Sequence, residues 1–252
     1  MQVVGYRTAV REDGPALVVA EDGAVSRVSL APGERLDYGL GARHCAGAVD
    51  GDTHHACGDE SAPYCPLHSS TWVCARCTGD CLKEEMDCRE DHAIYLAAFA
   101  PDVFKVGVTR EWRLDTRLRE QGAQRAAHLQ TVPNGRIARE IEADIATEIP
   151  DRVRVPAKLD GLHEDVDADA WAAALADFDP VEEFAFDYGF DLDSRPVATT
   201  AARGTVVGTQ GRVLVLERGD TAYGIDLRDL VGHELDPEKA DANRQSSLAG
   251  YL

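Results

Sequence analysis

Lysine is scarce in this chain of 252 residues: only Lys83, Lys105, Lys158 and Lys239 stand among its 26 basic residues. Acidic residues number 45, so the formal net charge is −19. A surface rich in aspartate and poor in lysine stays hydrated in concentrated salt, because its carboxylates hold water and repel one another. The composition therefore predicts a halophilic protein, adapted to a cytoplasm that contains multimolar salt.

Long apolar runs and a secretory leader are lacking as well. The chain has no uninterrupted apolar stretch of about 18 residues, roughly the length that a membrane-spanning helix needs. Its first residues, MQVVGYRTAVRED, do not show a basic segment followed by an apolar run, which is the pattern of a signal peptide. We expect a cytoplasmic protein that does not contact a membrane.

All seven cysteines, and four of the eight histidines, lie between residues 44 and 91. Cys65-x2-His68 and Cys74-x2-Cys77 have the spacing of metal knuckles, in which a two-residue gap turns both side chains onto one ion. An odd number of cysteines in a chain without a leader argues against disulfides. Few large apolar residues occur here, and a structural zinc ion, which supplies about 10–16 kcal/mol, can replace a missing core.

Seven cysteines and one histidine supply eight ligands, which is enough for two tetrahedral zinc sites. The most economical partition gives one ion to Cys45, Cys57, Cys65 and His68, and the other to Cys74, Cys77, Cys81 and Cys88. His44 or His92 could replace one of these ligands. An iron–sulfur cluster is the alternative at the second quartet, since four closely spaced thiolates suit it too. Both quartets are closed, which favours a structural role.

Composition divides the chain into six segments, and the fold class that we predict is α+β. The predicted segments are an N-terminal β segment (1–43), a zinc-ribbon-like Cys/His module (44–91), an α/β domain (92–158), an acidic helical linker (159–195), a small β domain (196–235) and a polar tail (236–252). Within the α/β domain, residues 93–97 and 104–108 are predicted to form adjacent antiparallel strands. Ile137, Ile141 and Ile145 are four apart, which predicts one face of a helix.

The order AIY, KVG, Thr-x7-Arg-Leu and Ala-x3-Glu in this domain resembles the GIY-YIG nuclease superfamily, especially the branches with lysine in the second motif. The resemblance implies that Tyr95 lies beside the scissile phosphate and that Lys105 activates water or neutralises charge. It also implies that Arg117 clamps the phosphate and that Glu142 binds Mg²⁺, with Glu140 as the second choice for that role.

Gly107 matches the glycine of the second motif, where a side chain would crowd the site, whereas Ala93 replaces the glycine of the first motif. The cysteine-rich segment followed by IYLA…KVGVTR…RLREQGA also resembles an uncharacterised family of bacteria and archaea. That resemblance covers most of the chain and implies no established activity.

Positive charge is concentrated between residues 104 and 139, where eight bases oppose three acids in a chain that is acidic overall. This contrast favours a polyanionic partner, DNA or RNA, bound through direct arginine–phosphate contacts. The candidate nucleic-acid-binding residues besides the catalytic candidates are Arg110, Arg113, Arg119, Arg125, Arg136 and Arg139. Trp112 could add stacking if it is exposed. The alternative is that these arginines pair with the linker, where residues 159–193 contain twelve acids and no lysine or arginine.

Together these features predict a zinc-containing nucleic-acid-binding protein that cuts phosphodiester bonds with Mg²⁺. Two alternatives remain open. One is a non-catalytic module that binds DNA, RNA or the ribosome, and the other is a zinc-stabilised protein-interaction scaffold.

The halophilic composition generates the first testable prediction. The melting temperature should rise when KCl is increased from low to multimolar concentration, because salt screens the repulsion among the 45 carboxylates. Thermal unfolding followed by circular dichroism measures this shift. Equal melting temperatures at both salt concentrations would contradict the prediction.

Overall fold

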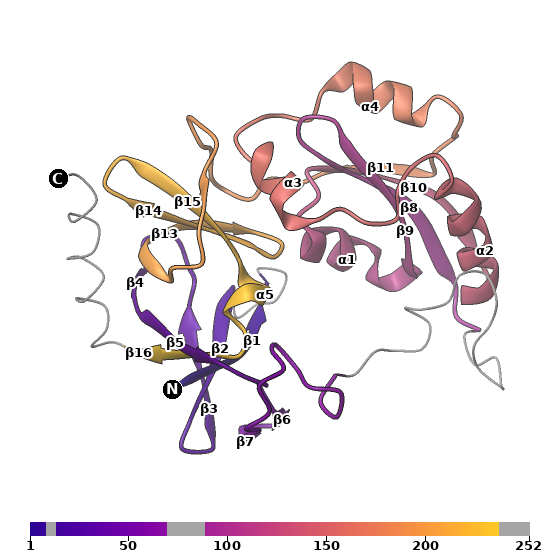
Figure 1. Cartoon of the computed structure of the whole chain (residues 1–252). Coiled ribbons are helices and arrows are strands. Elements are labelled where there is room, and N and C mark those ends of the chain that lie inside the picture. The colour runs from indigo at the N-terminus through magenta and orange to yellow at the C-terminus, as the bar shows by residue number, and fades with distance from the viewer. Residues whose placement is uncertain (9–13, 70–88, 237–252) are drawn as a thin grey trace. The chain divides into compact units, whose positions relative to one another are not determined.

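Strands from both ends of the chain come together in one folding unit. A computed structural model describes residues 1–8, 14–69 and 89–236, and the second predicted quartet, Cys74, Cys77, Cys81 and Cys88, lies outside these residues. The terminal unit combines Met1–Ser70 with Pro196–Leu252, and the central unit is Thr71–Arg195 (Figure 1).

Short strands dominate the terminal unit. Its first half contains β1 (Gln2–Arg7), β2 (Ala16–Glu21), β3 (Ala24–Ser29), β4 (Arg35–Asp37), β5 (Gly39–Arg43), β6 (Ala48–Asp50) and β7 (Thr53–His55). Its second half contains β12 (Val197–Ala198), β13 (Arg203–Gln210), β14 (Val213–Arg218), β15 (Thr221–Asp226), the short helix α5 (Leu227–Leu230) and β16 (His233–Asp236).

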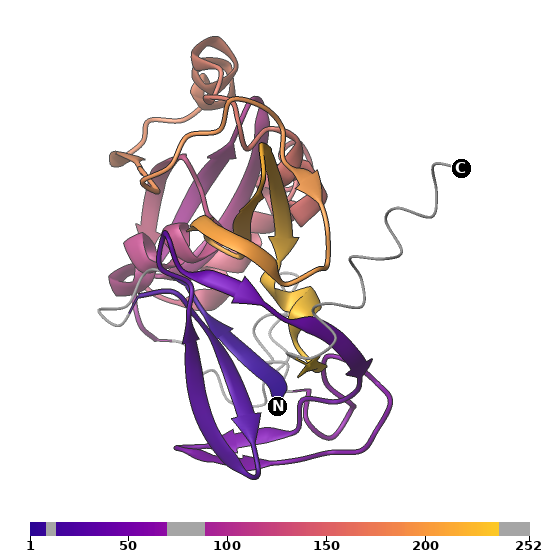
Figure 2. The same ribbon diagram turned by 90° about the vertical axis from the view of Figure 1, so that its left-hand side faces the viewer.

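Two sheets in this unit each mix strands from the two halves. One has the order β5-β16-β1-β2-β3-β7-β6, and the other has the order β12-β15-β14-β13-β4. Figure 2 shows the N-terminal strands in indigo and purple and the C-terminal strands in yellow. Neighbouring strands are antiparallel except β12 and β15, which pair in parallel.

Tight turns set the register of the hairpins. Asp22 and Gly23 connect β2 to β3 with φ angles of 51° and 82°, and Glu21 pairs directly with Ala24. A two-residue connection with both φ angles positive matches the right-handed twist of the flanking strands, and glycine adopts such angles at little cost.

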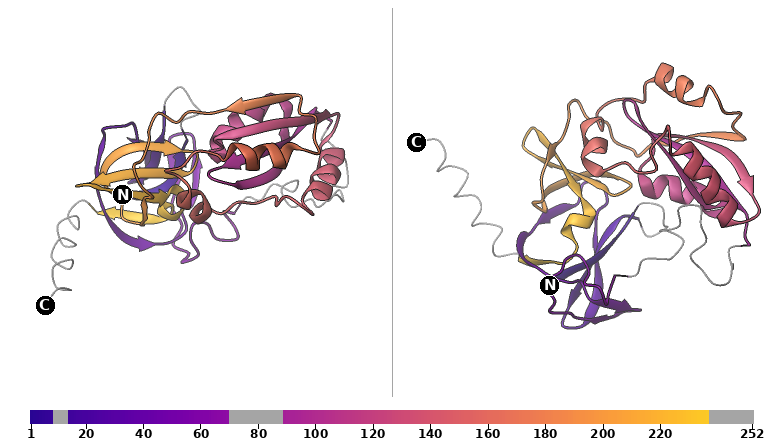
Figure 3. Two further views of the ribbon diagram at one scale, coloured as in Figure 1. Left: turned by 90° about the horizontal axis from the view of Figure 1, so that it is seen from above. Right: turned by 45° about the vertical axis from the view of Figure 1, so that its right-hand side comes forward.

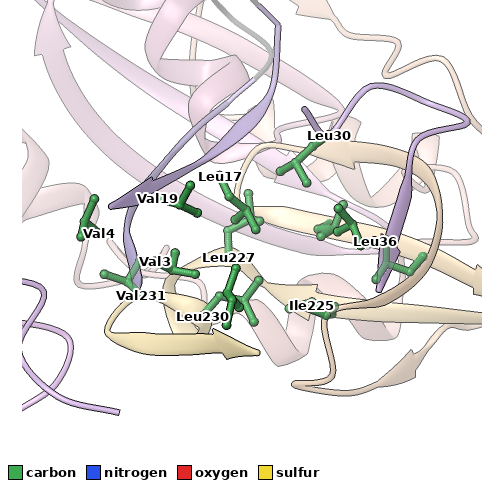
Figure 4. Close-up of a cluster of buried hydrophobic side chains, with 14 of the residues drawn as sticks. Val3, Val4, Leu17, Val19, Leu30, Leu36, Ile225, Leu227, Leu230 and Val231 are labelled. Carbon is green, nitrogen blue, oxygen red and sulfur yellow. The ribbon is translucent and has the colours of Figure 1, made fainter. Parts of the chain in front are cut away.

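The core of the terminal unit joins β1 and β2 to β14, β15 and α5. Leu17, Leu36, Ile225 and Leu227 are almost completely buried there, and Figure 4 shows them pointing into one cluster. Since these side chains come from residues nearly 200 positions apart, burial of apolar area couples the two ends of the chain.

The central unit contains a four-stranded antiparallel sheet with the order β11-β10-β8-β9. The strands are β8 (His92–Phe99), β9 (Val103–Arg110), β10 (Arg125–Val132) and β11 (Glu182–Ala185). Its helices are η2, a 3-10 turn (Glu111–Arg113), α1 (Leu114–Gln121), α2 (Gly135–Ile145), α3 (Val155–Asp160) and α4 (Ala168–Leu175). All eight residues of β8 are buried.

Helices cover both faces of β8, as the views in Figure 3 show. Tyr95 and Phe99 pack in one cluster with Leu118 of α1. Ile94 and Leu96 pack in another cluster with Ala138 of α2 and with Trp171 of α4. Because successive side chains of a strand point to opposite faces, a strand covered on both sides is expected to be apolar, and in β8 only His92 and Tyr95 carry polar groups.

The predicted α+β class is wrong, because strands make up 41% of the structure and helices only 19%, in three sheets. Short runs that were interpreted as separate terminal segments combine into two sheets, and β6 and β7 contribute strands from residues that we assigned to a zinc-ribbon-like module. The GIY-YIG-like domain of that prediction is not shown.

Local predictions for the central unit agree with the structure. The strands predicted at 93–97 and 104–108 are β8 and β9, and they pair antiparallel with Tyr95 opposite Gly107. The predicted helix is α2, in which Ile141 and Ile145 pack against the sheet, whereas Ile137, predicted to lie on the same face, is exposed. Within the described part of the chain, no helix has the length and apolar character of a membrane span.

Candidate metal centre and basic cluster

Four side chains of the terminal unit meet at one point, and they are the predicted first quartet: Cys45, Cys57, Cys65 and His68. Their ligand atoms all lie within 4.8 Å of one another. His68 Nδ1 is 3.4 Å from Cys45 Sγ and 3.2 Å from Cys65 Sγ. In tetrahedral zinc the sulfur and nitrogen ligands are about 3.6 Å apart, given Zn–S and Zn–N bonds of roughly 2.3 and 2.0 Å. The donor set therefore fits a metal ion such as zinc.

Backbone N–H groups favour the thiolate form of Cys45. The N–H groups of Cys65 and Gly47 donate to Cys45 Sγ at 3.2 and 3.4 Å. Burial raises the pKa of Cys45, but the two N–H donors lower it, and the net shift is downward. A thiolate is the species that binds metal, so the loop prepares this ligand for an ion.

The loop that carries Cys45 is hydrogen-bonded to the first strand of the terminal unit. Gln2 of β1 donates to the carbonyls of Cys45 and Gly232 at 3.3 and 3.1 Å. Gly47 has a φ of +66°, and a Cβ there would lie 2.1 Å from the carbonyl oxygen of His55. These contacts hold the loop that carries Cys45 in one conformation, and any side chain at position 47 would displace it.

The two alternative histidine ligands have other roles. His44 Nδ1 is 3.0 Å from the carbonyl oxygen of Cys57, so it contacts the backbone of a ligand rather than the ligand group. His92 Nδ1 is 2.6 Å from the carbonyl oxygen of Glu90 in the central unit. Neither belongs to the group that can hold an ion. With four protein ligands the site has no open position for water or substrate, which is typical of structural zinc.

A second group of side chains is built around Tyr95 in the central unit. Tyr95 lies opposite Gly107 across β8 and β9, and a Cβ at position 107 would be only 2.5 Å from the Tyr95 hydroxyl oxygen. The glycine thus makes room for the ring to lie across β9. The hydroxyl group is hydrogen-bonded to Gln121 and Arg117 of α1.

Lys105 lies two residues before Gly107, so its side chain starts on the same face of β9. Burial lowers the pKa of Lys105 to about 8, and the charge of Arg117 lowers it too, whereas Glu142 opposes the shift. Burial raises the pKa of Tyr95, against the charge of Arg117 and in the same direction as that of Glu142. The structure therefore brings Tyr95, Lys105, Arg117 and Glu142 within electrostatic reach of one another, and we call these four residues the basic cluster.

Glu142 is buried on α2 and forms an ion pair with Arg139. Helix α2 begins after Asn134, whose side chain accepts a hydrogen bond of 3.0 Å from the Ile137 N–H. Among the described residues Glu142 belongs to no group of three acidic, histidine or cysteine ligands. An ion at Glu142 would therefore need ligands from water or from a phosphate. The second choice, Glu140, is exposed and pairs with Arg136 at 3.0 Å.

The other predicted arginines have different surroundings. Arg113 pairs with Glu120 at 3.1 Å, and Arg110 pairs with Glu90 at 3.0 Å. Arg119 lies over the ring of Phe186 at 4.6 Å and pairs with Asp115.

Arg125 lies over the ring of Trp171 at 5.7 Å and is 3.7 Å from Glu183, which belongs to the acidic segment that we considered as an alternative partner. Four of the other arginines on the predicted list pair with acids three to seven positions away in the sequence, namely Arg113, Arg119, Arg136 and Arg139. The partner of Arg110 is Glu90, 20 positions before it.

The sequence analysis missed one member of the site and one ion pair. Gln121 contacts the Tyr95 hydroxyl group, and Arg139, which was predicted to bind nucleic acid, pairs with Glu142. Spacing offered a signal for both, since Gln121 follows Arg117 by four residues and Arg139 precedes Glu142 by three. Residues so spaced are neighbours on a helix.

Comparison with known proteins places the chain in a family. Residues 60–235 match the family described as "Protein of unknown function (DUF2797)". The chain belongs to DUF2797. No curated protein and no solved structure matches it. Nothing in these comparisons relates this DUF2797 protein to the GIY-YIG nucleases.

The metal quartet generates a prediction for zinc content. Replacing His68 by alanine in this DUF2797 protein should remove one equivalent of bound metal and lower the melting temperature, because three ligands hold the ion less tightly than four. Elemental analysis of the purified protein measures the metal. His55→Ala is the control, since His55 is exposed and outside the quartet. Unchanged metal content in His68→Ala would contradict the assignment.

The shifted pKa of Lys105 generates a prediction for stability. Folding lowers this pKa from 10.5 to about 8, so the folded state disfavours the protonated lysine. The wild type should gain stability as pH rises from 8 toward 10.5, because only the unfolded state still binds the proton there. Lys105→Met should melt at a higher temperature than the wild type at pH 7, with a smaller advantage at pH 10.

Lys158→Met is the control, measured by the same thermal melts. Lys158 Nζ donates to the carbonyl of Gln121 at 2.7 Å and lies 4.0 Å from the centre of the Phe99 ring. Because this lysine has favourable partners, its replacement should lower the melting temperature at both pH values. A Lys105→Met advantage that is equal at pH 7 and pH 10 would be inconsistent with the lowered pKa.

Proposed function

We propose that the central unit binds the phosphate backbone of a nucleic acid at the basic cluster, while the metal centre stabilises the terminal unit. The observation that carries this proposal is that Arg117 contacts the Tyr95 hydroxyl group and also lies within electrostatic reach of Lys105. These groups come from β8, β9 and α1, which the buried sheet holds in fixed positions.

The chemistry of the three groups suits a phosphate. The guanidinium of Arg117 can form paired hydrogen bonds to two phosphate oxygens, and an ammonium group adds a compact positive charge. The ammonium group of Lys105 forms no hydrogen bond or ion pair with other residues in the described ranges, so an incoming anion need not displace a partner from it. Tyr95, whose pKa burial raises, remains protonated at neutral pH and can donate a hydrogen bond.

A polymer of phosphates fits better than a single phosphate. Arg110 and Arg113 continue the positive charge from β9 into η2, and both are paired with acids in pairs that solvent reaches. Exposed ion pairs are worth about 0–1 kcal/mol, so a phosphate can replace the carboxylate at little cost. In high salt the Debye length is about 3 Å, which leaves direct contacts of this kind as the main attraction.

Hydrolysis of the bound phosphodiester is the second candidate function, and the lowered pKa of Lys105 together with the buried Glu142 favours it. A lysine with a pKa near 8 is partly neutral at neutral pH and can accept a proton from an attacking water. Glu142 is the residue that would hold Mg²⁺, an ion that is often bound by one carboxylate together with substrate phosphates. Binding of the ion would require Glu142 to release Arg139.

The binding proposal predicts the effect of removing one guanidinium. Arg117→Ala should weaken binding of labelled DNA or RNA by about 10- to 100-fold, because a hydrogen bond to a charged group contributes about 1.5–3 kcal/mol. Fluorescence anisotropy at the KCl concentration of greatest stability measures the affinity. Arg119→Ala, on the same helix but with its guanidinium over Phe186, should leave the affinity nearly unchanged. Equal effects of the two substitutions would argue against the cluster.

The hydrolysis candidate predicts a dependence on Glu142. Cleavage of a nucleic acid in Mg²⁺ should be lost in Glu142→Gln and retained in Glu140→Gln, which removes an exposed carboxylate from the same helix. Gel analysis of the products measures cleavage. Binding without any cleavage would identify a non-catalytic module. No binding of DNA or RNA by the wild type would leave a zinc-stabilised scaffold as the function.

A further inference from the structure

Trp112 is a large aromatic side chain that the fold leaves in solvent, with 71% of its surface exposed. It belongs to η2, where the chain passes from β9 into α1. Trp171 of the same unit is buried at 2% exposure in the core. The core of this unit can therefore accommodate a tryptophan ring, yet Trp112 lies outside it.

Polar contacts fix the Trp112 ring in place. Its Nε1–H donates to Glu90 Oε2 at 3.3 Å, and the same carboxylate oxygen binds Arg110 at 3.0 Å. The guanidinium of Arg113 lies 5.9 Å from the ring centre. A ring held in this way loses little conformational freedom when another aromatic group stacks on it, so more of the stacking free energy remains for binding.

One carboxylate links the ring to the basic cluster. Glu120 Oε1 accepts from Arg113, which contacts Trp112, and Glu120 Oε2 lies 3.5 Å from Arg117. Arg117 follows Trp112 by five positions, which is an axial rise of about 7.5 Å in an α-helix and slightly more through the 3-10 turn η2. A nucleotide whose phosphate lies at Arg117 can therefore bring its own base, or the adjacent one, to the ring.

We propose that Trp112 is a stacking platform for an unpaired base, so that the nucleic acid bound at the basic cluster is single-stranded or has a nucleotide turned out of its duplex. This inference rests on the proposed function. Bases in a duplex are stacked on one another, and their faces are accessible only when the strand is unpaired. An aromatic ring beside arginines that contact phosphates is the arrangement with which proteins bind single strands without reading their sequence.

Nucleic acid is a better occupant of this surface than an apolar protein partner. Arg110 and Arg113 flank the ring, and the stretch from residue 104 to 139 has five more bases than acids. Desolvation of two arginines against an apolar surface would be costly, whereas phosphates satisfy them.

The test compares three labelled ligands of equal length: a single strand, the duplex that this strand forms with its complement, and the same strand with abasic sites. Fluorescence anisotropy measures the affinity of the full chain and of Trp112→Ala, Trp112→Phe, Arg117→Ala and Val181→Ala. The last is a control that removes exposed apolar surface elsewhere in the same unit. DNA and RNA versions distinguish the two backbones.

Stacking predicts that Trp112→Ala weakens binding of the intact single strand by about 5- to 100-fold and changes binding of the duplex and the abasic strand less than twofold. Trp112→Phe should retain most of the affinity, and Val181→Ala all of it. The loss from Trp112→Ala and the loss from abasic sites should not add, because both remove the same contact.

Two results would overturn the stacking inference but leave the proposed function intact. If Arg117→Ala weakens binding while Trp112→Ala does not, the phosphate site is correct and the stacking platform is wrong. The same conclusion follows if Trp112→Ala weakens all three ligands equally, since a base is then not needed. If the wild type binds none of the three strands, the proposed function itself fails.

Discussion

Burial of β8 on both faces is the constraint on which the central unit depends. Every residue from His92 to Phe99 is buried, and α1 covers one face while α2 and α4 cover the other. Such a strand has no exposed face on which polar residues would be tolerated. His92 and Tyr95 are the two exceptions, and Tyr95 defines the site: its ring is part of the core, yet its hydroxyl group reaches Arg117 and Gln121.

Gly107 makes room for the Tyr95 side chain on β9. Without a Cβ at that position the Tyr95 ring crosses the neighbouring strand, and Lys105 starts from the same face two residues earlier. The result is a positive group and a phenol held by the sheet rather than by flexible loops. Donors that are already held in place lose little conformational entropy when an anion binds to them.

Patterns within a few residues were predictable, and pairings across long distances were not. The buried-strand pattern at 93–97 and the second strand predicted at 104–108 correspond to β8 and β9, and the isoleucine spacing predicted α2. The quartet of Cys45, Cys57, Cys65 and His68 followed from ligand counting.

The fold class was wrong because the pairing of β1 with β16, and of β4 with β13, depends on residues about 170 to 230 positions apart. No local pattern encodes such a pairing. The neutralisation of Glu142 by Arg139 was missed for another reason, namely that both were assigned to ligands instead of to each other.

The start of the family match at residue 60 separates elements that the fold keeps together. Cys65 and His68 lie inside the matched region, whereas Cys45 and Cys57 precede it. Strand β13 lies inside, but its neighbour β4 does not, and β16 would lose both β1 and β5. A fragment trimmed to the match would therefore expose two sheet edges and the apolar side chains of β14 and β15, and would retain half of a tetrahedral donor set. The cooperative folding module of this protein is longer than the segment by which its family is recognised.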